Sequence, residues 1–264
     1  MILWKHRRGV ILLLGGVAIA LLYILYTGAA FAGDTASHFK SKSHLKSTFH
    51  DHENDASADK LAADEENEAP IPVGKDAIIF VIGDSHIAHL NDAISQEVIK
   101  NAQPDFETNH KVVVFGMPGA TVDTLRTSEK LIYSLKSDRP ELVYLHIGSN
   151  DADSKMAVDE ISGNILKYSI ELEMVYGVKS VILSEQFHRK KTRNLPPKEY
   201  DLKIIELNKQ LRFHDHTRFW SHNQLMQAKE EILGEDGVHL NDYGQSYFYN
   251  SIKSGLNYLL KLHK

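Results

Sequence analysis

Four short segments of the chain contain the residue types that can transfer an acyl group to and from a serine. They are "GDSH" at 83–86, "GMPGAT" at 116–121, "GSND" at 148–151 and "DGVH" at 236–239. A serine hydroxyl becomes an effective nucleophile when a histidine, oriented by a carboxylate, removes its proton. Backbone N–H groups at glycines and an asparagine amide can then stabilise the negative charge that develops on the substrate oxygen. Together the four segments contain the groups that such chemistry needs.

Each of these residues also has an ordinary structural interpretation. Serine is common at helix N-caps, so Ser85 alone would be assigned to that role. Glycines occur in turns, and Asn150 and Asp151 suit the start of a helix. Asp236 and His239 have the spacing of an ion pair within one loop. The functional interpretation is favoured because all four segments occur together, three directly after apolar runs and the fourth before the last helical pattern.

The rest of the chain alternates between apolar strands and amphipathic helices. Runs such as "AIIFVI" are apolar throughout, which is typical of strands buried on both faces of a parallel sheet. The pattern predicts strands at 77–82, 111–115, 142–147, 180–185 and 217–220. It predicts helices at 87–101, 122–136, 156–176 and 196–212, and a closing helix containing Phe248, Ile252, Leu256 and Leu259. We therefore expect an α/β fold, a three-layer α/β/α sandwich with a mainly parallel five-stranded sheet.

This fold would bring the four segments together. The carboxyl ends of parallel strands meet at one edge of the sheet, and ligands bind beyond that edge. The segments at 83–86, 116–121 and 148–151 each follow a strand, so we expect them at the same rim. In the helix at 196–212, Leu202, Ile205, Leu207 and Leu211 are expected to face the core.

The arrangement resembles the SGNH hydrolases, also called GDSL-type esterases, over residues 76–262. "GSND" and "DGVHLN" are specific to that family, whereas "GDS" alone is not. The resemblance implies that Ser85 is the nucleophile, and that Asp236 and His239 complete a catalytic triad. It implies an oxyanion hole formed by Gly119 and Asn150 with the backbone of Ser85. It also implies a flavodoxin-like form of the α/β fold and a site that needs no metal and no organic cofactor.

Two positions qualify the resemblance. Gly116 competes with Gly119 as the oxyanion glycine, and Gly119 is preferred because small and threonine residues follow it. His86 stands where the family usually has leucine, and we expect it to crowd or polarise the mouth of the site. The G-x-S-x-G motif of α/β-hydrolases is absent, which disfavours that fold.

The predicted function is that of a membrane-tethered, exported serine esterase. Its substrate would be an O-acyl ester, such as an acetylated glycan or a lipid ester. The same residues would also serve an O-acyltransferase. The alternative from another class is a catalytically weak domain of this fold that binds a glycan or a protein at the end of a stalk. The sequence leaves the ester and the oligomeric state open.

The first 33 residues form a predicted membrane anchor. An uncharged run from Gly9 to Gly33 follows "KHRR", and about 20 apolar residues suffice to span a bilayer as a helix. The basic residues before this run, with Asp34 after it, predict a cytoplasmic N-terminus and a domain on the other side. A cleaved signal peptide is the alternative, because "AFA" at 30–32 suits a cleavage site. Either way the domain would be extracytoplasmic (lumenal, periplasmic or extracellular), and cleavage would make it secreted.

Residues 34–75 form a predicted stalk that leads to the hydrolase-like domain at 76–264. The stalk has few apolar residues and no periodicity, so it cannot bury enough surface to order itself. The histidines of the stalk are His38, His44, His50 and His52. They could bind a metal, but their spacing implies no fixed ligand geometry, so a solvated linker is favoured.

Composition excludes several classes of partner and site. The net charge of −5 and the interspersed charges argue against nucleic acid. The chain has no cysteine, which excludes disulfides and thiolate metal sites. The most basic stretch of the predicted domain, "RKKTR" at 189–193, reads as a solvated loop, with a basic rim for an anionic substrate as the alternative.

Overall fold

A computed structural model of the protein describes residues 74–214 and 218–260. All of these residues belong to one compact unit, Asp59–Lys264. The predicted membrane anchor at 1–33, and all but the last two residues of the predicted stalk at 34–75, lie outside the described residues. Within the described ranges, no helix combines the length and the apolar character needed to cross a membrane.

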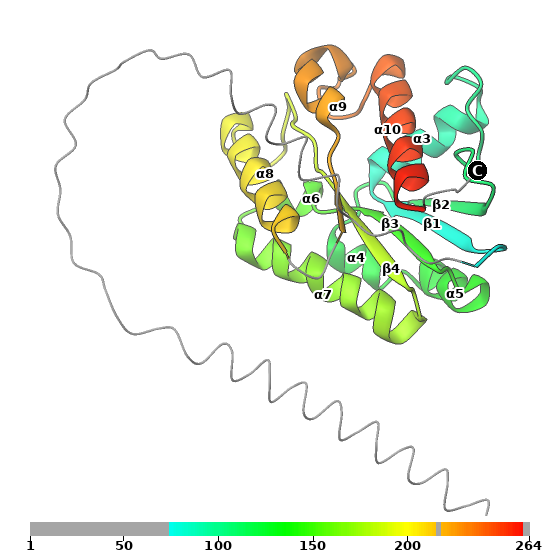
Figure 1. Ribbon diagram of the computed structural model, residues 1–264. Helices are drawn as coiled ribbons and strands as arrows, with labels where there is room; N and C mark the ends of the chain where they lie inside the picture. The colour runs from blue at the N-terminus through cyan, green and yellow to red at the C-terminus, as the bar shows by residue number, and fades with distance from the viewer. Residues whose placement is uncertain (1–73, 215–217, 261–264) are drawn as a thin grey trace, which may run out of the picture. The chain divides into compact units, whose positions relative to one another are not determined.

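The centre of the fold is a five-stranded parallel sheet, which confirms the predicted strands (Figure 1). The strands are β1 (Ile78–Gly83), β2 (Lys111–Gly116), β3 (Leu142–His146), β4 (Ser180–Ser184) and β5 (Arg218–Trp220). Their order is β2-β1-β3-β4-β5, and every neighbouring pair is parallel. Gly83 at the end of β1 pairs with Gly116 of β2 and His146 of β3, so three strands end at the same level.

Helices cover both faces of this sheet (Figure 1). Alternate residues of β1 point to opposite faces because side chains alternate along a strand. Ile79 and Val81 belong to a core shared with α3 and α10, whereas Phe80 and Ile82 belong to a core shared with α4, α5, α7 and α8. The helices are α3 (Ser85–Ser95), α4 (Val122–Arg126), α5 (Glu129–Asp138), α6 (Ser149–Ala152), α7 (Val158–Tyr176), α8 (Pro197–Arg212), α9 (Asn223–Ala228) and α10 (Asp242–Leu260), with a 3-10 turn at Lys229–Ile232.

Two predicted helices have different bounds in the structure. The predicted helix at 87–101 begins earlier and ends at Ser95, shortly before Glu97 adopts a left-handed backbone with φ of 58°. The predicted helix at 122–136 is divided into α4 and α5, because the Ser128 side chain caps a new helix by accepting the N–H of Leu131. The short helices α6 and α9 were not predicted, since neither is long enough to show a helical period.

The predicted buried face of the helix at 196–212 is partly wrong. Leu202 and Ile205 are 60% and 54% exposed. The residues that face the core are Tyr200, Ile204, Leu207 and Leu211, which recur at helical spacing along α8. The sequence pattern allowed either of two apolar faces of this helix to be buried. The face that is buried contains the large aromatic residue Tyr200, which is fully buried.

Gly116 permits the close approach of α3 to the end of β2. A Cβ atom at this position would lie 2.1 Å from the backbone nitrogen of Ala88. The three nearest atoms all belong to Ala88, two of them in its backbone, so no flexible side chain is there to move away. Gly163, in the middle of α7, is the opposite case, because a Cβ there would meet no atom within 4 Å.

These two glycines predict opposite effects of the same substitution on stability. Gly116→Ala should lower the free energy of unfolding by about 1–3 kcal/mol, because overpacking forces the backbone of α3 away from β2. Gly163→Ala should raise it by roughly 0.5–1 kcal/mol, because alanine is the better helix former. Chemical denaturation of the full chain measures both changes. A Gly116→Ala protein as stable as the unmodified one would show that α3 does not pack as described.

Candidate active site

Ser85 lies at the turn from β1 into α3, where it is the first residue of the helix. The N-cap is Asp84, whose Oδ1 accepts the N–H of His86 at 3.0 Å. Ser85 is therefore not needed as the cap. The turn is tight, since a Cβ on Gly83 would lie 2.4 Å from the carbonyl oxygen of His146. This geometry leaves the Ser85 hydroxyl at the carboxyl edge of the sheet, where it lines a pocket.

The structure brings Ser85, His239 and Asp236 into one line of hydrogen bonds. His239 Nε2 lies 3.0 Å from Ser85 Oγ, although 154 positions separate the two residues. His239 Nδ1 lies 2.6 Å from Asp236 Oδ2. The sequence predicted that these three side chains meet, and the distances are those of a nucleophile, a base and an orienting carboxylate.

The turn that carries Asp236 and His239 explains how residues three positions apart face each other. Asp236 Oδ1 accepts the N–H groups of Val238 and His239 at 2.9 and 3.0 Å, so its carboxylate lies inside the turn. Gly237 adopts a φ of 67°, which glycine adopts without strain. Partial burial opposes ionisation of Asp236, but these N–H groups and His239 outweigh it and lower the pKa of the carboxyl to about 2. The carboxylate is therefore ionised at neutral pH.

Gly119 and Asn150 line the same pocket as Ser85 and His239. Gly119 has a φ of 74°, and a Cβ there would meet nothing within 4 Å, so its backbone borders open space. Gly116 is instead packed against Ala88 and is not among the residues that line this pocket. The structure thus places Gly119, and not Gly116, beside the serine. The pocket has a volume of about 210 Å³.

Arg189 is a buried pocket residue to which the sequence analysis gave only a surface role. Its Nη2 donates to Ser149 Oγ at 2.8 Å and to Asn150 Oδ1 at 3.2 Å. Its guanidinium carbon lies 5.3 Å from the centre of the Tyr200 ring. Only its place after β4, at the rim of the sheet, could have suggested this position. Because an arginine only donates hydrogen bonds, it fixes the oxygen of the Asn150 amide toward itself.

The amide nitrogen of Asn150 therefore faces away from Arg189. Asn150 Nδ2 donates to the carbonyl oxygen of Ala120 at 2.9 Å, which uses one of its two hydrogens.

Asp151, the next residue, has a different position. Its carboxylate is buried and accepts the N–H of Val122 at the start of α4, at 3.3 and 3.1 Å. Burial raises the pKa of Asp151 to about 6.

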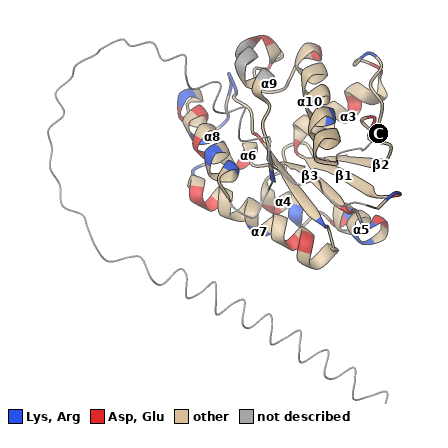
Figure 2. Ribbon diagram, in the orientation of Figure 1, with Lys and Arg blue, Asp and Glu red and all other residues tan. Residues whose placement is uncertain are grey.

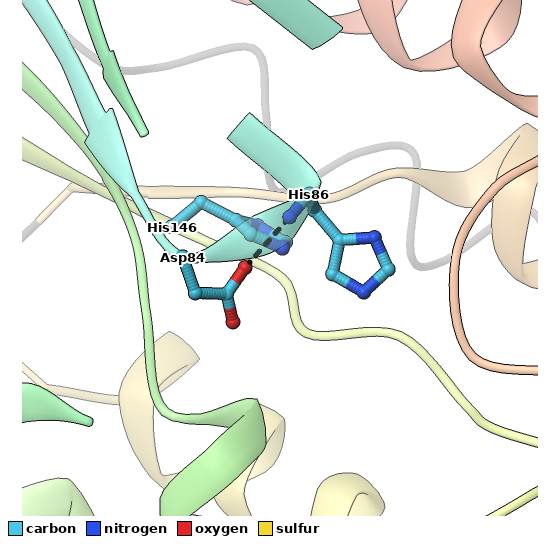
Figure 3. A group of neighbouring side chains, drawn as sticks. All are labelled: Asp84, His86 and His146. Carbon is cyan, nitrogen blue, oxygen red and sulfur yellow. Dashed lines mark hydrogen bonds between the residues drawn. The ribbon is translucent and has the colours of Figure 1, made fainter. Parts of the chain in front are cut away.

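Among the residues that the structure describes, one group of side chains could hold a metal ion: Asp84, His86 and His146 (Figure 3). One ligand atom from each lies within 4.8 Å of the others, and all three are buried. Burial lowers the pKa of His86 to about 3 and of His146 to about 4, so both rings are neutral at neutral pH. Burial opposes the ionisation of Asp84, but His86, His146 and Ser149 outweigh it and hold its pKa below the ordinary value. Neutral imidazole and carboxylate are metal-ligand types, and the chemistry that Ser85 and His239 can perform does not require a metal.

The expectation that His86 crowds the mouth of the site is wrong, whereas the alternative, that it polarises the site, stays a prediction. His86 is 1% exposed, and its ring packs edge-on against the rings of His146 and Phe187. Because it follows Ser85 on the helix, its side chain turns to the core side while the serine faces the pocket. The ring fills a buried position and also lies edge-on to the His239 ring, with 5.8 Å between the ring centres.

Comparisons with known proteins agree with this fold. The family model of the GDSL-like lipases/acylhydrolases matches residues 79–252, which is more than half of the chain. Among solved structures, one from Streptococcus pneumonia is 22% identical with a TM-score of 0.52, covering 75% of this chain and 90% of its own. A member of the lipolytic protein G-D-S-L family from Veillonella parvula is 19% identical with a TM-score of 0.51, covering 71% and 98%. A search of curated proteins finds no match.

The likeness to these structures concerns the fold alone, whereas the family match also covers the segments with Ser85, Gly119, Asn150, Asp236 and His239. The parallel sheet, the serine at the end of β1 and the Asp/His turn before α10 are the arrangement that the sequence resemblance led us to expect. The chain belongs to the GDSL-like lipase/acylhydrolase family.

Proposed function

We propose that this domain hydrolyses O-acyl esters through an acyl-enzyme on Ser85. The observation that carries the proposal is the line of hydrogen bonds from Ser85 Oγ through His239 to Asp236, which opens into the pocket. In the first half-reaction, Ser85 Oγ attacks the ester carbon and its proton passes to His239 Nε2. His239 then gives that proton to the departing alcohol. In the second half-reaction, His239 takes a proton from water, and the resulting hydroxide attacks the acyl carbon. The bond from this carbon to Ser85 Oγ then breaks, His239 returns the proton to Ser85 Oγ, and the acid is released.

The oxyanion of both half-reactions would bind to three donors. They are the backbone N–H groups of Ser85 and Gly119 and the second hydrogen of Asn150 Nδ2. The first hydrogen of Asn150 Nδ2 is donated to the carbonyl oxygen of Ala120, and Asn150 Oδ1 accepts a hydrogen bond from Arg189. We assign Arg189 as a positioning residue, because it would act through Asn150 and not on the substrate. Its bond to Asn150 sets the direction in which the amide nitrogen points.

The volume of the pocket favours a short acyl group. Pockets for drug-sized ligands usually measure roughly 300–1,000 Å³, and this one measures about 210 Å³. An acetyl group on a glycan or a small alcohol fits this volume better than a long acyl chain. Transfer of the acyl group to an acceptor alcohol would use the same residues, and analysis of the products separates transfer from hydrolysis.

The first test of this function is the Ser85→Ala substitution in the full-length chain. The variant should lose both ester hydrolysis and covalent labelling by a fluorophosphonate, because both need the serine oxygen. Its fold should remain, because Asp84 caps the helix. Ser95→Ala is the matched control, since Ser95 lies on the same helix but is exposed and bonds only to a carbonyl of its own helix. Activity should be measured with acetyl esters alongside circular dichroism.

Labelling of Ser85→Ala at the same rate as the unmodified chain would exclude Ser85 as the nucleophile. Absence of labelling and of hydrolysis in the unmodified chain would favour the alternative, a stalked domain that binds a glycan or a protein.

The second test concerns the amide and the residue that positions it. Asn150→Ala should lower kcat by roughly 10²–10³-fold with little change in KM, because the bond strengthens mainly in the transition state. Arg189→Met should also lower kcat, and the change in kcat should be larger than any change in KM. In the double variant, the loss should be no larger than in Asn150→Ala alone, because Arg189 would act through Asn150. Additive losses would separate Arg189 from Asn150, and an unchanged kcat in Asn150→Ala would return Asn150 to a structural role.

We also propose that an N-terminal helix tethers the domain to a membrane, with the domain outside the cytoplasm. The support is the uncharged run from Gly9 to Gly33 with basic residues before it. In sealed vesicles with the cytoplasmic side outward, added protease should leave the domain intact until detergent is added. Digestion without detergent would contradict this orientation.

A further inference from the structure

We propose that the ester substrate carries an anionic group, a carboxylate or a phosphate, which binds to Lys191 and Arg193 beside the acyl site. The inference rests on the proposed esterase function and names the class of its substrate. The two residues belong to the basic loop, which we define as residues 189–193 between β4 and α8 (Figure 2).

The wall of the pocket that holds Ser85 is predominantly positive. Its charged lining residues are three cations, Arg189, Lys191 and Arg193, and one carboxylate, Asp153. The chain as a whole has a net charge of −5, so this local excess of positive charge runs against its overall balance. A cleft lined by one sign of charge concentrates ligands of the opposite sign.

The carboxylate of Asp153 is already engaged by the backbone of the adjoining loop. It accepts the N–H groups of Arg193, Asn194 and Leu195 at 2.7, 3.1 and 3.3 Å. Asp153 therefore anchors the loop and is not in an ion pair with either proposed cation. In the part of the chain that the structure describes, neither Lys191 nor Arg193 forms a salt bridge, so both charges are available to a ligand.

The basic loop is attached to the catalytic turn on its other side. The backbone N–H groups of Lys190 and Lys191 donate to the carbonyl of Gly237 at 2.8 and 3.1 Å. A Cβ on Gly237 would lie 3.1 Å from Lys191 Cγ, so glycine allows this close contact. Lys191 Nζ donates to the carbonyl of Glu235 at 3.0 Å. The loop is thus fixed on two sides relative to Ser85 and His239, unlike a freely solvated loop.

The two cations suit a carboxylate or a phosphate. Arg193 offers a planar fork of donors that matches either anion, and Lys191 offers a point charge with two further N–H donors. Both side chains are exposed at the pocket rim, so the expected preference is moderate. Arg189 is less available, because its bonds to Ser149 and Asn150 hold it in the floor of the site.

The test compares acetyl esters that differ in charge but share the acyl group. The substrates are 4-acetoxybenzoate, 4-acetoxyphenyl phosphate and neutral methyl 4-acetoxybenzoate, each given to the full-length chain. The ratio of kcat/KM for each anionic ester to that for the neutral ester should fall about three- to tenfold in the Lys191→Gln/Arg193→Gln variant. Comparing ratios removes the intrinsic reactivity of each leaving group. The larger of the two changes identifies carboxylate or phosphate as the preferred anion.

The matched control is the Lys167→Gln/Lys198→Gln variant. It changes the net charge equally at two exposed helical positions outside the pocket and should retain the ratio. The proposal would be overturned if, for both anionic esters, the Lys191→Gln/Arg193→Gln variant had the same kcat/KM ratio to the neutral ester as the unmodified chain. An equal fall in the control would also overturn it, since that would be an effect of net charge.

A binding measurement separates failure of this proposal from failure of the esterase function. If no ester is hydrolysed, the proposed function fails. The anion site is then judged by titrating phenyl phosphate and benzoate into the Ser85→Ala chain. At least one anion should bind about three- to tenfold more weakly after Lys191→Gln/Arg193→Gln. Equal affinities of both anions with and without these substitutions would overturn the anion site independently of activity.

Discussion

The hydrogen bond between Ser85 Oγ and His239 Nε2 is the constraint on which the rest of the site depends. It joins the first strand of the domain to the turn before the last helix. Each end is fixed by its own local structure. Asp84 caps α3 at one end, and at the other an antiparallel bridge between Leu233 and Leu240 closes the loop that presents His239. The fold brings the two ends to one rim, so that the 3.0 Å distance between Ser85 Oγ and His239 Nε2 follows from its topology.

A layer of buried polar groups lies under this rim. Asp84 accepts from Ser149, Ser149 accepts from Arg189, and Arg189 also donates to Asn150. Such a network is favourable only when its members find partners, because an unpaired charge in the interior is costly. Its effect is to connect the N-cap behind Ser85 to the amide that we assign to the oxyanion hole. Preorganisation of the site thus rests on groups that do not themselves touch the substrate.

Much of the fold and of the candidate site could be predicted from the sequence, because both depend on strong local patterns. Continuous apolar runs located the strands, and strand ends located Ser85, Gly119 and Asn150. The place of Arg189 after β4 could have suggested a position at the rim, but its burial could not be predicted, because it depends on hydrogen bonds between loops that are distant in the chain. The burial of His86 was missed for a related reason. A polar residue after a strand reads as exposed, and only the packing of Phe187 and His146 around it shows otherwise.

The most direct test of this account is to identify the atom that carries the acyl group during turnover. The full-length chain would be mixed with a short-chain acyl ester, quenched in acid within the first turnovers, and analysed by peptide-mapping mass spectrometry. The account predicts a mass increase equal to the acyl group on the peptide that contains Ser85, with fragment ions that assign it to this residue. An acyl group on another residue, or turnover without any acylated peptide under the same quench, would contradict it.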